Sequence, residues 1–176
     1  MSVLLNLPLS LRSRSLKLAP SLARPALRYC PFGVIKAVLQ PALTSIFKEA
    51  LEDGDFEFLE NRWLSILVSD LSFEFWISFS GDQLILSQPI ENQTQAASFK
   101  ANAEDLLLIA GRKQDPDTLF FQRRLLIEGD TELGLEVKNL IDSIDLENLP
   151  SVVHYLVENT AQVIEQTRDD EKAQTY

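Results

Sequence analysis

Residues 71–79 read Leu-Ser-Phe-Glu-Phe-Trp-Ile-Ser-Phe, and this stretch decides the fold class of the chain. Every odd-numbered position is apolar, whereas most even-numbered positions are polar. A period of two is typical of a β-strand with one buried face. Residues 63–69 alternate in the same way, with Leu64, Ile66 and Val68 on one side. The two runs therefore predict neighbouring antiparallel strands.

Three further segments continue the strand pattern. Residues 80–82, Ser-Gly-Asp, have the composition of a tight turn, and residues 83–88 follow it as a third strand. Residues 96–101 predict a fourth, weaker strand, and residues 124–128 predict a last one. We therefore expect an antiparallel meander sheet of about five strands, with one wet face and one apolar face.

Segments with a helical period flank these strands on both sides. Pro41 opens a predicted amphipathic helix of about 12 residues that ends at Gly54, and a shorter helical piece at 34–39 precedes it. Later helices are predicted to begin near Asn102, Asp115, Asp130 and Leu149. The expected fold class is α+β, with amphipathic helices covering one face of the sheet.

Charge is distributed unevenly along the 176 residues. The 16 basic and 26 acidic residues give 16 − 26 = −10 overall. Residues 1–48 contain seven basic residues and no Asp or Glu, so residues 49–176 carry 9 − 26 = −17. Such asymmetry is typical of a chain that meets a charged surface. We expect a basic Leu/Arg/Ser-rich helical arm (1–33), one domain (34–168) and a polar tail (169–176).

The composition of the arm permits three interpretations. It fits a transit peptide, a segment lying on an anionic membrane, or an arm whose leucines pack on the domain. Four prolines, Pro8, Pro20, Pro25 and Pro31, argue against one long continuous helix in this region. No apolar run reaches the roughly 18 residues that a membrane-spanning helix needs.

The rare residues exclude most metal and cysteine chemistry. The chain has one cysteine, Cys30, and one histidine, His154, too few for an internal disulfide, a Cys/His zinc site or an iron–sulfur ligand set. The apolar helical pattern around His154 favours a packing histidine over a catalytic base. The glycines form neither a GxGxxG motif nor a phosphate-binding loop. We therefore expect no cofactor and no metal site.

The clusters of charged residues also favour structural roles over catalytic ones. Asp115 and Asp117 flank a proline at a predicted helix start, where acids ordinarily cap the helix. The basic pairs at 112–113 and 123–124 stand in a strongly acidic domain, which favours local ion pairs or one anionic headgroup over a nucleic acid. Neither acid–base catalysis nor nucleic-acid binding is expected.

Residues 112–145 read RKQDPDTLFFQRRLLIEGDTELGLEVKNLIDSID. This stretch resembles the accessory-factor family of bacterial ubiquinone biosynthesis, within the sterol carrier protein type 2 lipid-binding superfamily. The matching runs are 113–124, 127–135 and 137–140, with further similarity between 50 and 66. The resemblance covers about residues 34–146.

The resemblance implies a non-catalytic protein that holds a hydrophobic molecule between the sheet and its covering helices. Periodicity alone does not distinguish such a lipid tunnel from a solid core. The implied lipid-binding residues are apolar side chains of the sheet and the helices: Ile66, Val68, Phe73, Phe75, Ile77, Leu84, Leu86, Leu106, Phe120, Leu125, Ile127, Leu133, Val137 and Leu140.

The same resemblance implies partners and a location. The implied ligands are isoprenoid quinone precursors or phospholipid, and the implied protein partners are peptidase-like iron–sulfur proteins that hydroxylate the ring without oxygen. The resemblance also leaves open whether two copies of the chain form a homodimer. We expect a cytoplasmic protein with peripheral contact to the inner face of the cell membrane, because a bacterial resemblance favours membrane contact of the arm over targeting. The expected headgroup or membrane contacts are basic residues of the arm: Arg12, Arg14, Lys17, Arg24 and Arg28.

A second hypothesis uses the same apolar surfaces differently. The protein would be a membrane-docked scaffold with a solid core, which binds partner proteins and carries no lipid.

Overall fold

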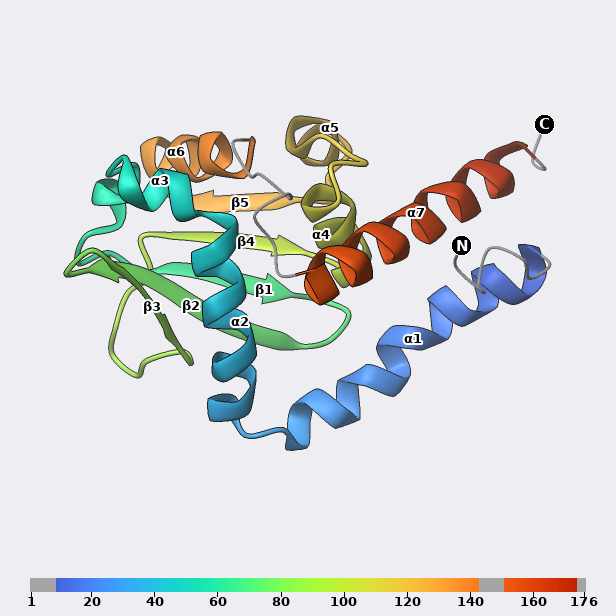
Figure 1. Cartoon of the computed structure of the whole chain (residues 1–176), viewed down its shortest axis with the longest axis horizontal. Helices are drawn as coiled ribbons and strands as arrows, with labels where there is room; N and C mark the ends of the chain where they lie inside the picture. Colours follow the sequence, from blue (N-terminus) through green and yellow to red (C-terminus); the bar gives the residue numbers. More distant parts are fainter. Residues whose placement is uncertain (1–8, 143–150, 174–176) are drawn as a thin grey trace.

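A computed structural model describes residues 9–142 and 151–173 and shows a five-stranded sheet with helices packed around it (Figure 1). The strands lie in the order β3-β2-β1-β4-β5. Their bounds are β1 (Leu64–Val68), β2 (Phe73–Ser80), β3 (Gln83–Ser87), β4 (Ala97–Ala101) and β5 (Leu126–Gly129). The predicted α+β class and the predicted number of strands are confirmed.

The first three strands form the predicted antiparallel meander. Ile66 is opposite Phe75 and Leu64 is opposite Ile77, so the apolar residues of β1 and β2 share one face. Strand β2 begins at Phe73 rather than at Leu71, because Ser72 has a φ of 49° and belongs to the β1–β2 turn.

The fourth strand departs from a simple meander. Strand β4 lies beside β1 and runs parallel to it, with Phe99 opposite Ile66, and β5 then pairs antiparallel with β4. Segment 88–96 carries the chain from the edge strand β3 to the other side of β1. In this interior position Ala97, Phe99 and Ala101 are buried. Alternation reports which face of a strand is buried, but it does not report the neighbouring strand.

The helices before the sheet are α1 (Leu9–Tyr29), α2 (Phe32–Ile46) and α3 (Lys48–Glu52), followed by the short 3₁₀ helix η2 (Glu57–Leu59). The prediction that prolines interrupt the arm is wrong within 9–29, since α1 passes through Pro20 and Pro25. The predicted helix start at Pro41 is also wrong, since Pro41 lies inside α2. A proline removes one backbone hydrogen bond but keeps a helical φ, and packing of α1 on α7 and of α2 on β3 offsets the loss.

The helices after β4 are α4 (Ala103–Ala110), α5 (Pro116–Phe121), α6 (Thr131–Asp142) and α7 (Ser151–Ala173). All four were predicted, and α7 continues beyond residue 168 into the predicted polar tail. Val163, Ile164 and Thr167, in the turns of α7 just before that tail, are buried. Leu149, where the last helix was predicted to begin, lies outside the described residues.

Helices α1 and α7 run side by side and project beyond the sheet (Figure 1). Helix α4 also packs against α7, and a methyl group added to Gly111 at the end of α4 would come within 2.5 Å of Ala161. Within the described parts of the chain, no helix is long and apolar enough to cross a membrane.

The face of the sheet opposite the main core is less wet than predicted. Ser65 and Trp76 are both nearly inaccessible to solvent. The Ser65 hydroxyl and the Trp76 indole N–H each donate to Glu74 Oε1, at 2.8 Å in both cases. These hydrogen bonds satisfy the polar groups, so the face can be covered without leaving them unpaired.

Candidate lipid-binding site

The apolar face of the sheet and the helices over it form one continuous core. Nine of the fourteen residues predicted to bind lipid belong to this core or pack directly against it: Ile66, Ile77, Leu84, Leu106, Leu125, Ile127, Leu133, Val137 and Leu140. They come from four strands or their flanks and from the helices α4 and α6. The structure therefore brings together side chains that are up to 74 positions apart in the sequence (140 − 66).

The other five predicted residues occupy different surroundings. Val68, Phe75 and Leu86 are buried on the same face of the sheet. Phe73 is half-buried and lines a hollow beside α1. Phe120 is 44% exposed, because the side of α5 that turns inward carries Leu119, which is fully buried.

Helix α6 lies close against β5 on this face. A methyl group added to Gly134 would meet the Cγ2 atom of Ile127 at 3.0 Å, so a glycine is what permits this approach. On the same helix Leu133, Val137 and Leu140 are buried. The layer between α6 and the sheet is thus closely packed, and a bound tail would have to separate these side chains.

Asp115 caps α5, as the sequence predicted, whereas Asp117 forms an ion pair instead of a cap. The Asp115 carboxylate accepts hydrogen bonds from the Thr118 backbone N–H at 3.0 Å and from the Thr118 hydroxyl at 3.1 Å, and so caps α5. The backbone hydrogen bond from Thr118 is the main reason that the pKa of Asp115 lies below its ordinary value of 3.8. Asp117 forms an ion pair with Lys138 of α6 at 2.7 Å.

Within the basic pair at 123–124, Arg124 forms a local ion pair, one of the two roles that the sequence left open. The Arg124 guanidinium bonds to the carboxylate of Asp105, whose side chain is only 4% exposed. Arg124 also donates to Gln122 Oε1 at 3.1 Å. Because a buried carboxylate is costly unless it is paired, this contact explains why an acid is tolerated inside α4.

A half-enclosed hollow of about 270 Å³ separates α1 from the β1–β2 turn. Its lining residues are Arg24, Leu27, Arg28, Leu71, Ser72 and Phe73. The Arg24 guanidinium donates to the Ser72 hydroxyl. Leu71 and Ser72 were not predicted as site residues, and no sequence signal identifies them, because the turn is 48 positions away from Arg24. The side chains of Arg12, Arg14 and Lys17 lie outside the described parts of the molecule.

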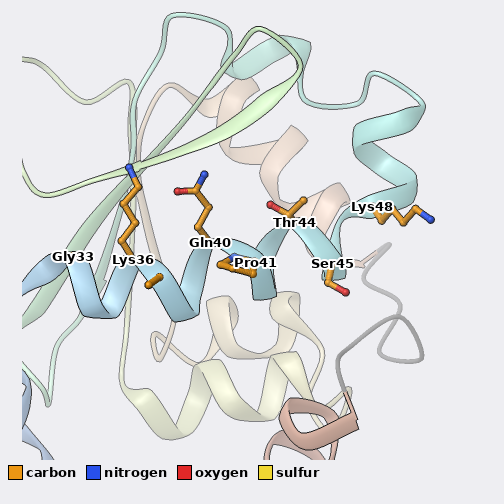
Figure 2. A pocket seen from close by; sticks show the side chains of 8 residues that line it. Gly33, Lys36, Gln40, Pro41, Thr44, Ser45 and Lys48 are labelled. Atoms are coloured by element: carbon orange, nitrogen blue, oxygen red, sulfur yellow. The ribbon is translucent and has the colours of Figure 1, made fainter.

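A second hollow, open and with a volume of about 830 Å³, follows one side of α2 (Figure 2). Helix α2 has no buried residue. Two of its side chains nevertheless bond to the edge strand: Lys36 Nζ donates to Leu86 O at 2.9 Å, and Gln40 Nε2 donates to Leu84 O at 3.1 Å. Both side chains point toward the sheet in Figure 2. They take the place of a neighbouring strand for these two carbonyl groups.

A third hollow, of about 400 Å³, lies between η2 and α6. Four glutamates line it together with Arg62, which forms an ion pair with Asp130 at 3.6 Å. Among the residues that the structure describes, no three His, Cys, Asp or Glu side chains converge as metal ligands.

Comparisons with known proteins identify the relatives of this chain. Residues 42–142 match the model of the SCP-2 sterol transfer family. The chain is 50% identical to a protein of Escherichia coli strain K12 named ubiquinone biosynthesis accessory factor UbiT, over 88% of this chain and 87% of that protein. The protein of the same name from Escherichia coli O157:H7 matches equally well.

One similar solved structure is titled UbiJ-SCP2 ubiquinone synthesis protein. It aligns with a TM-score of 0.52 over 64% of this chain and 97% of that chain. At 19% sequence identity this likeness shows a shared fold.

Proposed function

This chain belongs to the SCP-2 sterol transfer family, beside the UbiT accessory factors, and from that membership we propose that it is a non-catalytic lipid-binding factor in ubiquinone biosynthesis. The observation that supports the proposal most strongly is the 50% identity to UbiT across nearly the whole length of both proteins. The proposed cargo is a polyprenylated quinone precursor or a membrane lipid.

The apolar layer between the sheet and α6 supports this choice of cargo. Each buried CH₂ group contributes about 0.8 kcal/mol, so one five-carbon isoprene unit gains roughly 4 kcal/mol on leaving water. Such a tail cannot stay free in water, and the core that contains Val137, with Ile66 and Leu106 packed against it, offers it an apolar environment. When the tail enters, the contacts between those side chains are lost. The free energy gained by burying several isoprene units offsets that loss.

The proposed role is to shield the tail while the ring stays accessible to other proteins. We place the protein in the cytoplasm, in the oxygen-independent branch of the pathway, with peptidase-like iron–sulfur hydroxylases as its partners. Its arm would contact the inner face of the membrane, from which the precursors come.

Lipid extraction and mass spectrometry of the purified protein test the cargo. We expect isoprenoid lipid to copurify with the wild type. Leu106→Trp should reduce its recovery, because Leu106 is half-buried against the core and a larger side chain there occupies the space of the tail. Leu135→Trp is the matched control, since Leu135 is 55% exposed on α6. A wild-type protein that is repeatedly empty and takes up no added isoprenoid would refute lipid binding.

The scaffold hypothesis has one observation in its favour. Eight of the fourteen predicted lipid-binding residues are already buried by protein. A solid core predicts that Leu106→Trp lowers thermal stability and leaves the recovered lipid unchanged, whereas a lipid site predicts loss of lipid. Measuring both quantities on the same preparation separates the two functions.

A further inference from the structure

Helix α2 is loosely attached to the domain. The helices α4, α5, α6 and α7 all contain buried residues, whereas α2 contains none. Pro31 precedes its first residue without a side-chain cap, and Pro41 inside the helix has no N–H to donate to the preceding turn. Because a helix in a protein gains most of its stability from packing, α2 depends on the bonds and apolar contacts that join it to its neighbours.

The two ends of α2 are attached in different ways. Phe47 separates α2 from α3, and its ring packs edge to face on the ring of Phe56 at a centroid distance of 5.4 Å. Phe56 is buried, and Leu43 packs against the core one turn before Phe47. Nearer the other end, Lys36 and Gln40 bond to the edge strand β3. The C-terminal end of α2 therefore has an apolar anchor at Phe47, whereas polar side chains bond the rest of the helix to the sheet.

Water can replace the polar attachment. Lys36 Nζ and Gln40 Nε2 donate to the backbone carbonyl groups of Leu86 and Leu84, which belong to an edge strand and can bond to water once α2 moves away. The layer under α6 is different, because water offers no substitute for the close approach at Gly134 and for the buried apolar side chains of that helix. Of these two helices, α2 therefore separates from the sheet more easily.

Apolar side chains lie beside this polar attachment. Leu84 and Leu86 are 2% and 1% exposed and belong to the core face of β3. Ile35 and Leu39 of α2 are half-buried, and each directly precedes one of the two bonding side chains in the sequence. An opening between α2 and β3 would thus have apolar side chains on both walls. The open hollow of about 830 Å³ alongside α2 leaves the helix room to move (Figure 2).

We propose that α2 is the gate through which an isoprenoid tail enters the protein, and this inference rests on the proposed lipid-binding function. The helix turns about its anchor at Phe47, its two bonds to β3 open, and the tail passes between α2 and β3 to the core face of the sheet. The two bonds then form again. Because they are present in the empty and in the loaded protein alike, they set the rate of passage and leave the affinity for the lipid unchanged.

Stopped-flow fluorescence tests the gate on the full-length protein after copurified lipid has been removed. The probe is ubiquinone with a tail of two isoprene units, whose ring quenches the fluorescence of Trp63 and Trp76. We expect the rate of uptake by the wild type to level off at high probe concentration, because opening of α2 limits it. Lys36→Met with Gln40→Leu should raise this limiting rate and the release rate about tenfold or more, in step with amide exchange in α2, and leave the Kd unchanged.

Two further variants serve as controls. Lys48→Met removes an exposed lysine beyond the anchor and should leave the uptake and release rates unchanged. Lys36→Met alone removes one of the two bonds and should give an intermediate increase in both rates. This single variant also tests the gate if the double variant does not fold.

The outcomes separate the gate from the cargo. Faster amide exchange in α2 with unchanged uptake and release rates would overturn the gate and leave lipid binding standing. A weaker affinity with an unchanged uptake rate would also overturn it, because Lys36 and Gln40 would then hold the lipid itself. Absence of uptake by the wild type and by every variant would refute the cargo and the gate together, whereas uptake by the double variant alone would support both.

Discussion

Replacing Lys36 by Met and Gln40 by Leu removes both hydrogen bonds between α2 and the carbonyl groups of the edge strand β3. Because α2 has no buried residue, these two bonds and partly buried apolar contacts are what hold it on the sheet. We therefore expect the double variant to release α2 locally while the sheet stays folded.

The two bonds give the size of the effect. A net contribution of about 0.5–1.5 kcal/mol from the neutral Gln40 bond and about 1.5–3 kcal/mol from the charged Lys36 bond sums to roughly 2–4.5 kcal/mol. One factor of ten corresponds to about 1.4 kcal/mol, so amide exchange in α2 should accelerate about 30- to 1,600-fold.

Hydrogen exchange followed by mass spectrometry is the assay, with peptides from α2 compared with peptides from β1 and β2. Lys48→Met is the matched control, because Lys48 is exposed and forms an ion pair with Glu52 of its own helix, at 3.9 Å. Unchanged exchange in α2 of the double variant, or equal acceleration in α2 and β1, would show that these bonds do not anchor the helix.

Three further changes test the packing and the caps. Gly129→Ala should destabilise the protein by at least about 1–3 kcal/mol in urea unfolding, since Gly129 has a φ of 106° and an added methyl group would meet Ala96 O at 2.5 Å. Leu119→Ala should cost about 2–5 kcal/mol and lower the Tm by roughly 4–20 °C in a thermal melt, because Leu119 is fully buried. Asp115→Asn should remove part of the acid sensitivity of folding: the native pKa is depressed by the Thr118 N–H, so the stabilisation is present above the unfolded pKa and is lost as pH falls through the native pKa.

Each of these changes has an outcome that would contradict it. Gly33→Ala is the control for Gly129→Ala, because an added methyl group at Gly33 meets nothing within 4 Å, and equal effects would exclude the steric reason. A Tm unchanged by Leu119→Ala would mean that the core under α5 is not packed as described. If wild type and Asp115→Asn lose stability in parallel between neutral and acidic pH, the cap does not contribute to the pH dependence.

The sequence predicted the faces of the strands well because burial on one side of a sheet leaves a period of two. The alternation in 71–79 predicted that Phe75 and Ile77 share the core face with β1, and the register confirms it. The same signal could not predict the parallel pairing of Phe99 with Ile66. A strand in an interior position has the same alternation of apolar residues whichever strand lies beside it.

The helix boundaries predicted from prolines were wrong for a related reason. Pro41 is typical of a first helical turn, yet α2 begins at Phe32 and ends at Ile46. Local preference costs a few kcal/mol at most, and packing along the whole helix overrides it.

The candidate lipid layer was largely predictable, whereas of the residues that line the hollow beside α1 only Arg24, Arg28 and Phe73 were predicted. The lipid layer follows from apolar residues and a family resemblance, although the lipid-binding role of its residues stays a prediction. The hollow beside α1 joins Arg24 to Ser72 across 48 positions, and it depends on a left-handed turn that no periodicity reveals.

The parallel pairing of β1 with β4 has a consequence for synthesis on the ribosome. Strand β1 can pair with β2 at once, but its other edge waits for β4, which begins 29 positions after Val68 (97 − 68). At about 5–20 residues per second, that edge stays unpaired for about 1.5–6 s. Nascent chains that stop between β3 and β4 therefore expose the unpaired edge of a central, apolar strand, which another chain can pair with.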